Sequence, residues 1–303
     1  MIQKVNSMKK KNWIFVFLII LCLAGFYAYR AMDLMRTDTK APEIKISEEA
    51  LEVSVSEPRS ALLNGVTATD NRDGNVTASI VVEHVSLLDT DGRISVSYAA
   101  FDSSGNVSKA TREAKFTDYQ RPRFSLGNPL IYTNANFDVL GAVSAHDILD
   151  GDIQHRIRAS SLSRESIALE GIHEVEFSVS NSLGDTVSYV FPVEVIPADQ
   201  YNAKLSLKEY LIYLPVGANF VPGNYLDTFT IRNEETILSN GLPSNYHLQV
   251  GNTVNTSEPG VYTVSYKVTY IVRNENNMEV NQEYTAYSKL IVVVEGSFNG
   301  KYK

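Results

Sequence analysis

One pattern occurs twice in this chain of 303 residues. Residues 66–76 (VTATDNRDGNV) and 143–153 (VSAHDILDGDI) both follow V-x-A-x-D-x-x-D-G-x-[VI]. A second match follows each copy: residues 92–106 and 171–185 share G-x3-V-x-[YF] and then [DN]-S-x-G-[ND]. Two long matches in the same order indicate a repeated structural unit, so both stretches must adopt the same local fold.

A third copy is partial. Residues 260–266 (GVYTVSY) keep the G-x3-V-x-[YF] pattern, and residues 205–220 resemble 124–137 in the order of their apolar positions. The D-x-x-D-G run is missing from this copy. The sequence therefore predicts three modules, of which the third is divergent.

Within each module the apolar residues alternate with polar ones, as in Ile94, Val96 and Tyr98. Tyr266 and Phe177 occupy the position of Tyr98 in their own copies, and we expect them in the core. Strict alternation indicates strands that are buried on one face, and Gly-Asx runs between them indicate hairpins. Many short strands of this kind predict an all-β chain of three tandem β-sandwiches.

Residues 13–29 carry no charge, and Lys4, Lys9, Lys10 and Lys11 precede them. A cleaved signal peptide or an uncleaved anchor fits this layout. Bulky residues follow the apolar run where a signal peptidase needs small ones, which favours the anchor. The lysines predict a single-pass protein of the cell membrane, with the N-terminus cytoplasmic and the C-terminal modules extracellular.

These features set the expected organisation of the chain. The predicted segments are a cytoplasmic N-terminus (1–12), a transmembrane signal anchor (13–29), a tether (30–41), and three modules (42–118, 122–196 and 202–296).

Composition excludes several classes of function. The formal net charge is −8, which argues against nucleic acid as a partner. The single cysteine, Cys22, lies in the apolar segment, so the exported part has no disulfide and no cysteine nucleophile. The five histidines are scattered, and no carboxylate pair is singled out by spacing. We therefore predict a protein that is not an enzyme.

The order of the three motifs resembles the bacterial Ig-like domains related to hyalin repeats, a type also found in pesticidal crystal proteins and Gram-positive surface proteins. The resemblance is good in the first two modules and partial in the third. It implies an exported Ig-like β-sandwich used as a spacer, adhesion or binding module. It does not specify a ligand, since one fold supports many functions.

Aspartates concentrate in the turns of the repeats. In a sandwich of this topology the D-x-x-D-G loop and the D-S-x-G-N hairpin lie at one end, so their carboxylates should converge. Two interpretations stay open: a structural Ca²⁺ site, or turns shaped by side-chain-to-backbone hydrogen bonds. No other cofactor is expected. The candidate ligands are Asp70, Asp73, Asp102, Asp118, Asp147, Asp150 and Asp152.

Tyrosines are frequent in the third module, and either strand packing or a partner-binding surface accounts for them. The candidates for partner contact are Tyr210, Tyr213, Tyr225 and Tyr246. The predicted function is adhesion, assembly or spacing, with an extracellular protein partner bound at the distal third module. The alternative is a module that binds the cell wall or another envelope polysaccharide. The membrane is contacted through residues 13–29.

Overall fold

The computed structural model describes residues 2–36, 38–47, 50–89, 92–133, 138–160, 170–197, 202–273 and 280–296. Compactness divides the chain into two units. Unit one contains Met1–Val53, Glu57–Val85 and Ser95–Lys115, and unit two contains Ser54–Ser56, Ser86–Ile94 and Phe116–Lys303.

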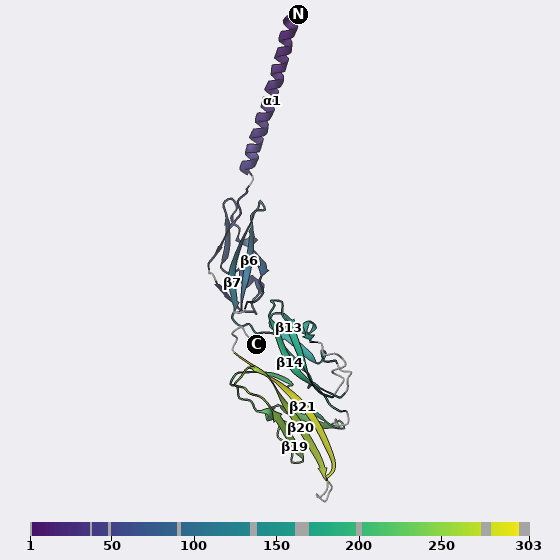
Figure 1. Cartoon of the computed structure of the whole chain (residues 1–303). Helices are drawn as coiled ribbons and strands as arrows, with labels where there is room; N and C mark the ends of the chain where they lie inside the picture. Colours follow the sequence, from purple (N-terminus) through teal and green to yellow (C-terminus); the bar gives the residue numbers. More distant parts are fainter. Residues whose placement is uncertain are drawn as a thin grey trace. The chain divides into compact units, whose positions relative to one another are not determined.

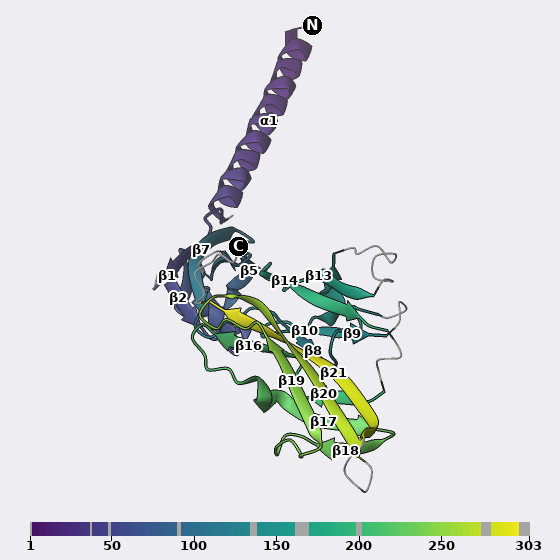
Figure 2. The ribbon, with the colours of Figure 1, turned by 60° about the horizontal axis from the view of Figure 1, so that its bottom comes forward.

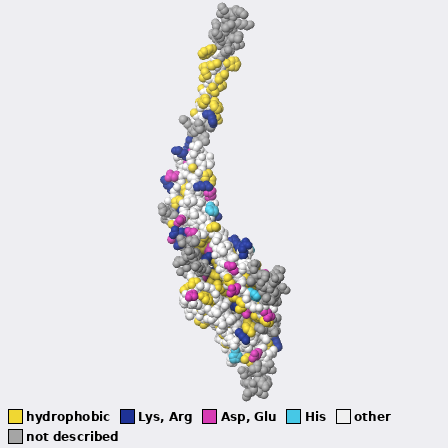
Figure 3. Space-filling view, viewed as in Figure 1, with side chains coloured by type: hydrophobic (Ala, Val, Ile, Leu, Met, Phe, Trp, Pro, Cys, Tyr) yellow, Lys and Arg dark blue, Asp and Glu magenta, His cyan; other side chains and the backbone are white. Residues whose placement is uncertain are grey.

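The N-terminal segment is one continuous helix, α1, from Ile2 to Arg36 (Figure 1). It extends beyond the predicted span at both ends, because the flanking Lys, Met, Leu, Ala and Arg residues favour the helical state. Its stretch Phe15–Met32 is long and apolar enough to cross a membrane, a description that a signal sequence also meets. Apolar side chains cover this stretch and are exposed (Figure 3).

The strands of the described residues form six sheets, and within this part of the chain each predicted module contains one sheet of three strands and one of four. The mostly-β architecture with one N-terminal apolar helix is as predicted. The first sheet pair has the orders β1-β3-β4 and β2-β7-β6-β5. Its strands are β1 (Glu43–Ile46), β2 (Ala50–Val53), β3 (Val66–Asp70), β4 (Gly74–Asn75), β5 (Val81–Val85), β6 (Arg93–Phe101) and β7 (Val107–Phe116).

The second sheet pair has the orders β11-β10-β8 and β12-β13-β14-β9 and so repeats the first. Val66 and Val143 start strands with the same burial pattern, and both strands pair antiparallel with the first strand of their copy. Its strands are β8 (Arg123–Leu126), β9 (Ile131–Tyr132), β10 (Val143–Asp147), β11 (Gly151–Asp152), β12 (Arg158–Ala159), β13 (Gly171–Ser180) and β14 (Thr186–Val195).

The third sheet pair has the orders β15-β17-β18 and β16-β21-β20-β19. Figure 2 shows β19, β20 and β21 side by side as long strands of one sheet. The strands are β15 (Lys204–Leu207), β16 (Leu211–Pro215), β17 (Leu226–Ile231), β18 (Glu234–Ile237), β19 (Tyr246–Asn252), β20 (Gly260–Arg273) and β21 (Val280–Glu295). Short 3-10 turns span Arg59–Leu63, Thr77–Ser79, Gln154–Arg156 and Pro222–Tyr225.

One aromatic position anchors each core. Tyr98, Phe177 and Tyr266 lie on β6, β13 and β20, and all three are fully buried, as the alignment of the repeats predicts. Where the residue is Tyr, its hydroxyl donates a hydrogen bond to a carbonyl: Tyr98 to Leu62 at 2.7 Å and Tyr266 to Pro222 at 2.9 Å. An aromatic ring buried at such a position removes about 150–250 Å² from water and so contributes strongly to the core.

The second and third sheet pairs share one continuous core inside unit two. The Tyr213 hydroxyl accepts a hydrogen bond from the Phe124 amide at 2.8 Å, and Arg123 forms an ion pair with Glu295 at 2.8 Å. Lys289 on β21 pairs with Glu194 on β14 at 2.6 Å. These contacts pack the second and third sheet pairs together, which the sequence predicts as two modules, 122–196 and 202–296.

Candidate functional site

The D-x-x-D-G loop of the first repeat begins at the end of β3. Asp70 Oδ1 accepts hydrogen bonds from the amides of Arg72 (2.7 Å) and Asp73 (2.9 Å). Gly74 follows with a φ of 70°, a conformation that glycine adopts without steric cost because it has no Cβ. The sequence order Asp-x-x-Asp-Gly thus forms a tight turn whose first carboxylate is held in place.

The hairpin between β6 and β7 places a second carboxylate beside the first. Asp102 Oδ1 accepts from the amides of Ser104 (2.9 Å) and Asn106 (2.8 Å), and its Oδ2 accepts from Asn106 Nδ2 at 2.7 Å. Asn106 Nδ2 is also within 3.2 Å of the Asp38 carbonyl oxygen. Asn106 therefore links the hairpin to the segment that follows α1.

Asp73 fastens the loop to the hairpin. Its two oxygens accept from the amide and hydroxyl of Ser103, at 2.7 and 2.8 Å. Asp150 does the same in the second repeat, where it accepts from the amide (2.6 Å) and hydroxyl (2.7 Å) of Ser182, and also from Arg156 at 2.5 Å. In both repeats this second aspartate of the motif is a clamp between two turns, which is the turn-shaping interpretation.

Three carboxylates converge in unit one. Ligand oxygens of Asp38, Asp70 and Asp102 all lie within 4.8 Å of one another. Of the predicted metal ligands this group contains Asp70 and Asp102, and it adds Asp38, which belongs to the predicted tether. An aspartate lies five positions before the first strand in both repeats, Asp38 before Glu43 and Asp118 before Arg123. This shared spacing is the feature of the sequence that could have indicated Asp38.

Hydrogen bonding favours the ionised forms of Asp70 and Asp102. The amides of Asp73 and Arg72 hold the pKa of Asp70 below its usual value. Burial acts to raise the pKa of Asp102, but the hydrogen bonds from Asn106 and Ser104 outweigh it and the net pKa is lowered. Two carboxylates of the cluster are therefore negatively charged at neutral pH.

The second repeat builds the corresponding place differently. Asp147 holds the turn amides of Leu149 and Asp150, and Asn181, the counterpart of Asp102, donates to Asp147 Oδ2 at 3.1 Å. The Tyr119 hydroxyl donates to Asp185 at 2.8 Å, and burial, with Asp185 nearby, strongly raises the pKa of this phenol. Arg121 pairs with Asp185 at 2.6 Å. An arginine thus supplies the positive charge here.

Two further predicted ligands lie apart from these groups. Asp118 accepts from the Ser54 hydroxyl at 2.6 Å and the Val55 amide at 2.8 Å, which lowers its pKa. Asp152 Oδ1 accepts from the Gln154 amide at 2.9 Å and so shapes the turn after β11. That Asp118 and Asp152 bind a metal ion remains a prediction.

The four candidate tyrosines do not form one exposed face. Tyr210 and Tyr246 are buried, 8% and 9% exposed, and Tyr246 packs edge-on against Phe229. Tyr213 is hydrogen-bonded to Phe124 in the joint between the second and third sheet pairs. Tyr225 is half-buried against Phe220. The packing interpretation accounts for the first three.

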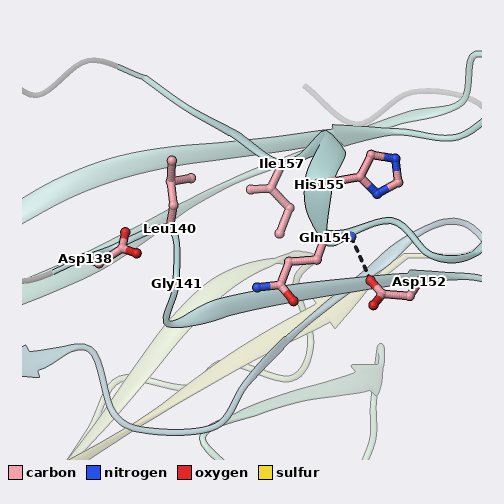
Figure 4. Close-up of a pocket in the computed structure, with 7 residues that line it drawn as sticks. All are labelled: Asp138, Leu140, Gly141, Asp152, Gln154, His155 and Ile157. Atoms are coloured by element: carbon pink, nitrogen blue, oxygen red, sulfur yellow. Dashed lines mark hydrogen bonds between the residues drawn. The ribbon is translucent and has the colours of Figure 1, made fainter.

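One groove in the second sheet pair has a volume of about 570 Å³. The groove presents two carboxylates, an amide and an imidazole beside apolar side chains (Figure 4). Its lining residues are Asp138, Leu140, Gly141, Asp152, Gln154, His155 and Ile157. Such a mixture of donors and acceptors suits a polar ligand.

The sheets define the class: an all-β chain of Ig-like sandwich type behind one N-terminal apolar helix. No family model matches the chain, so the resemblance to hyalin-repeat-related and crystal-protein domains is not confirmed. An uncharacterized 81.3 kDa protein of Acholeplasma phage L2 is 31% identical over 129 residues, which are 42% of this chain and 16% of that protein. The chain therefore matches only a small part of that relative.

Solved structures with some likeness also contain β domains. A structure of CBM51-2, in complex with GlcNAc, and INT domains from Clostridium perfringens ZmpB is 14% identical with a TM-score of 0.21, covering 84% of this chain and 42% of that one. The protocadherin GammaB4 extracellular domain is 11% identical with a TM-score of 0.19, covering 84% and 49%. Mouse cadherin-23 EC22-24 is 13% identical with a TM-score of 0.18, covering 85% and 100%. Scores this low carry no functional argument.

Proposed function

We propose that this chain is a membrane-anchored protein whose exported sandwiches bind or space a partner at the cell surface. The observation that supports this most is α1, whose apolar stretch Phe15–Met32 is exposed along its length and directly precedes the sandwiches. Exposed apolar area of this extent is unstable in water and is accommodated by a bilayer. The proposal assigns no catalysis.

Membrane attachment is tested on the chain recovered from its own cells. We expect a carbonate-resistant membrane protein whose intact mass includes residues 1–36. A mature chain that begins after Tyr29 and washes off the membrane would identify a cleaved signal sequence and refute the anchor. Replacing Leu21 with Arg, in the middle of the span, should release the uncleaved chain, because a charge at the bilayer centre costs about 3 kcal/mol.

The first form of the proposal is a protein partner bound by the third sheet pair. Its edge strands β18 and β19 each have one neighbour in their sheets, and both expose apolar side chains, Ile237 (56%) and Val250 (38%). Edge strands offer unpaired backbone groups to an added strand, and exposed apolar side chains add affinity. An extracellular protein with an extended segment would fit such an edge.

The second form is an envelope polymer bound in the groove of Figure 4. Hydroxyl groups of a saccharide pair well with Asp138, Gln154 and His155, which line it. No aromatic side chain is among its lining residues in the described part of the chain, so affinity would depend on hydrogen bonds.

Paired substitutions separate the two forms. Cross-linking on intact cells should recover a defined protein with the native chain and lose it with Ile237→Asp plus Val250→Asp. Ile172→Asp on β13 is the matched control, because this residue is 65% exposed in the second sheet pair. If purified cell-wall polymer instead binds, and Gln154→Ala with His155→Ala abolishes that binding, the polymer form holds and the protein-partner form fails.

A further inference from the structure

Asp38, Asp70 and Asp102 are largely buried residues. They are 7%, 8% and 9% exposed, and they come from three segments: the stretch after α1, the end of β3, and the β6–β7 hairpin. Like charges held this close in a medium of low dielectric repel strongly. One cation lies near: Arg72 Nε is 3.8 Å from Asp38 Oδ2, and the Arg72 side chain is 43% exposed. One such exposed contact offsets little of this repulsion.

A second observation points to a ligand. Asp70 Oδ2 and Asp38 Oδ2 are both buried and have no hydrogen-bond partner, although the other oxygen of each carboxylate is bonded to backbone amides. A buried carboxylate oxygen without a partner is costly, and native proteins rarely keep one. Both of these oxygens belong to the same cluster.

The second repeat is an internal comparison. It keeps the turn at Asp147, but Asn181 replaces Asp102 and Arg121 adds a guanidinium. No oxygen of Asp147 or Asp185 is among the buried atoms that lack a partner in the described residues. In the second repeat Arg121 lies 2.6 Å from Asp185 and the oxygens of Asp147 and Asp185 are satisfied, whereas in the first repeat Arg72 stays 3.8 Å from Asp38 and three carboxylates face one another.

The chemistry of the donor set selects the ion. All three side chains offer hard oxygen ligands, with no imidazole or thiolate, which suits Ca²⁺ or Mg²⁺ rather than zinc. Ca²⁺ binds oxygens at about 2.3–2.6 Å, so ligands on its sphere lie up to about 5 Å apart. The carboxylate oxygens lie within 4.8 Å of one another, which fits that sphere, and the flexible coordination of Ca²⁺ suits side chains from three separate segments better than the strict octahedron of Mg²⁺ does.

We propose that Asp38, Asp70 and Asp102 bind one Ca²⁺ ion, with Asn106 positioning Asp38 and Asp102. The ion neutralises two of the three charges and gives the unpartnered oxygens their ligand. Because Asp38 is two residues beyond the end of α1, the ion also ties the end of the helix to the first sheet pair. Calcium thereby stiffens the joint between the membrane helix and the first sandwich.

The test measures calcium binding to the full chain in detergent by equilibrium dialysis with ⁴⁵Ca²⁺. We expect one saturable site with a Kd of about 0.1–1 mM, the range of extracellular calcium modules. Asp70→Asn should weaken binding at least tenfold, about 1.4 kcal/mol, because one ligand charge is lost while its turn-forming Oδ1 is retained. Asp38→Asn should weaken Ca²⁺ binding by the same amount, and this residue does not belong to any strand.

Asp147→Asn, at the same position of the second repeat, is the matched control and should change the Kd less than about twofold. Asp102→Asn is a further variant that should leave the fold intact, because the second repeat carries Asn at the matching position. Hydrogen exchange at residues 38–42 should slow with Ca²⁺ in the native chain and not in Asp70→Asn. Three results would overturn the proposal. They are the absence of saturable Ca²⁺ binding at 10-fold the expected Kd, a loss of Ca²⁺ affinity in Asp147→Asn equal to that in Asp70→Asn, and an affinity for Mg²⁺ equal to that for Ca²⁺.

Discussion

The ion pair of Lys289 and Glu194 supports a prediction about the joint between the second and third sheet pairs. Lys289 Nζ lies 2.6 Å from Glu194 Oε2, but the two side chains differ in exposure: 6% for Lys289 and 29% for Glu194. Removal of either partner breaks the same contact. The costs should differ, because each substitution leaves a different charge behind.

The magnitudes follow from burial. At 2.6 Å an effective dielectric of about 20 gives a gross attraction of about 6 kcal/mol, much of it offset by desolvation of the ammonium. Glu194→Met leaves that ammonium buried without a counter-charge and should destabilise by about 3 kcal/mol. Lys289→Met leaves a carboxylate that water can reach and should cost about 1 kcal/mol. The double substitution should lie within about 1 kcal/mol of the native chain.

Native-state hydrogen exchange of peptides from β14 and β21 measures these free energies without requiring the whole chain to unfold in one step. Glu174→Met on β13, an exposed glutamate on the neighbouring strand, is the control and should change them by less than about 0.5 kcal/mol. If Lys289→Met costs as much as Glu194→Met, or the double substitution is worse than either single one, burial of the ammonium does not govern this joint.

Three other outcomes can be checked by urea unfolding of the full chain in detergent. Tyr266→Phe should destabilise by about 1 kcal/mol, because the Pro222 carbonyl loses its donor; equal stability would refute this. Gly74→Ala should cost about 1 kcal/mol from its φ of 70° alone, since its Cβ would meet nothing within 4 Å; a neutral result would show that the turn adapts. Burial acts to raise the pKa of Asp150, but hydrogen bonds from Ser182 and Arg156 lower the pKa overall. The ionised Asp150 carboxylate therefore stabilises the fold above pH 3.8, and this stabilisation is lost as the pH falls through the lowered pKa. Asp150→Asn should flatten this loss of stability at acid pH, and an unchanged pH profile would contradict the prediction.

Local sequence predicted most of the strands. Alternation around Tyr98, Phe177 and Tyr266 placed these residues in the cores, because a strand with one buried face needs an apolar residue at every second position. The Asp-x-x-Asp-Gly spacing likewise predicted the turns at Asp70 and Asp147, whose hydrogen bonds reach only two or three residues along the chain.

Contacts distant in sequence were harder to predict. Asp73 and Asp150 were candidates for metal binding on their spacing, and that role stays a prediction; the hydrogen bonds that their oxygens accept from the hairpin serines Ser103 and Ser182 could not be read from the local pattern. Asp38 was missed, while Asp118, at the matching place before the second repeat, bonds Ser54 and Val55 instead. Equal spacing in sequence therefore did not give equal surroundings.

The sequence by itself determined the repeat, the all-β class and the apolar helix, since these depend on periodicity and on interactions between near neighbours. The tertiary structure alone decided that the second and third sheet pairs share one apolar core and are bridged by the ion pair of Lys289 and Glu194. It also decided which aspartates face one another. Both depend on segments that folding brings together from far apart in the chain, and no local pattern encodes the distance between them.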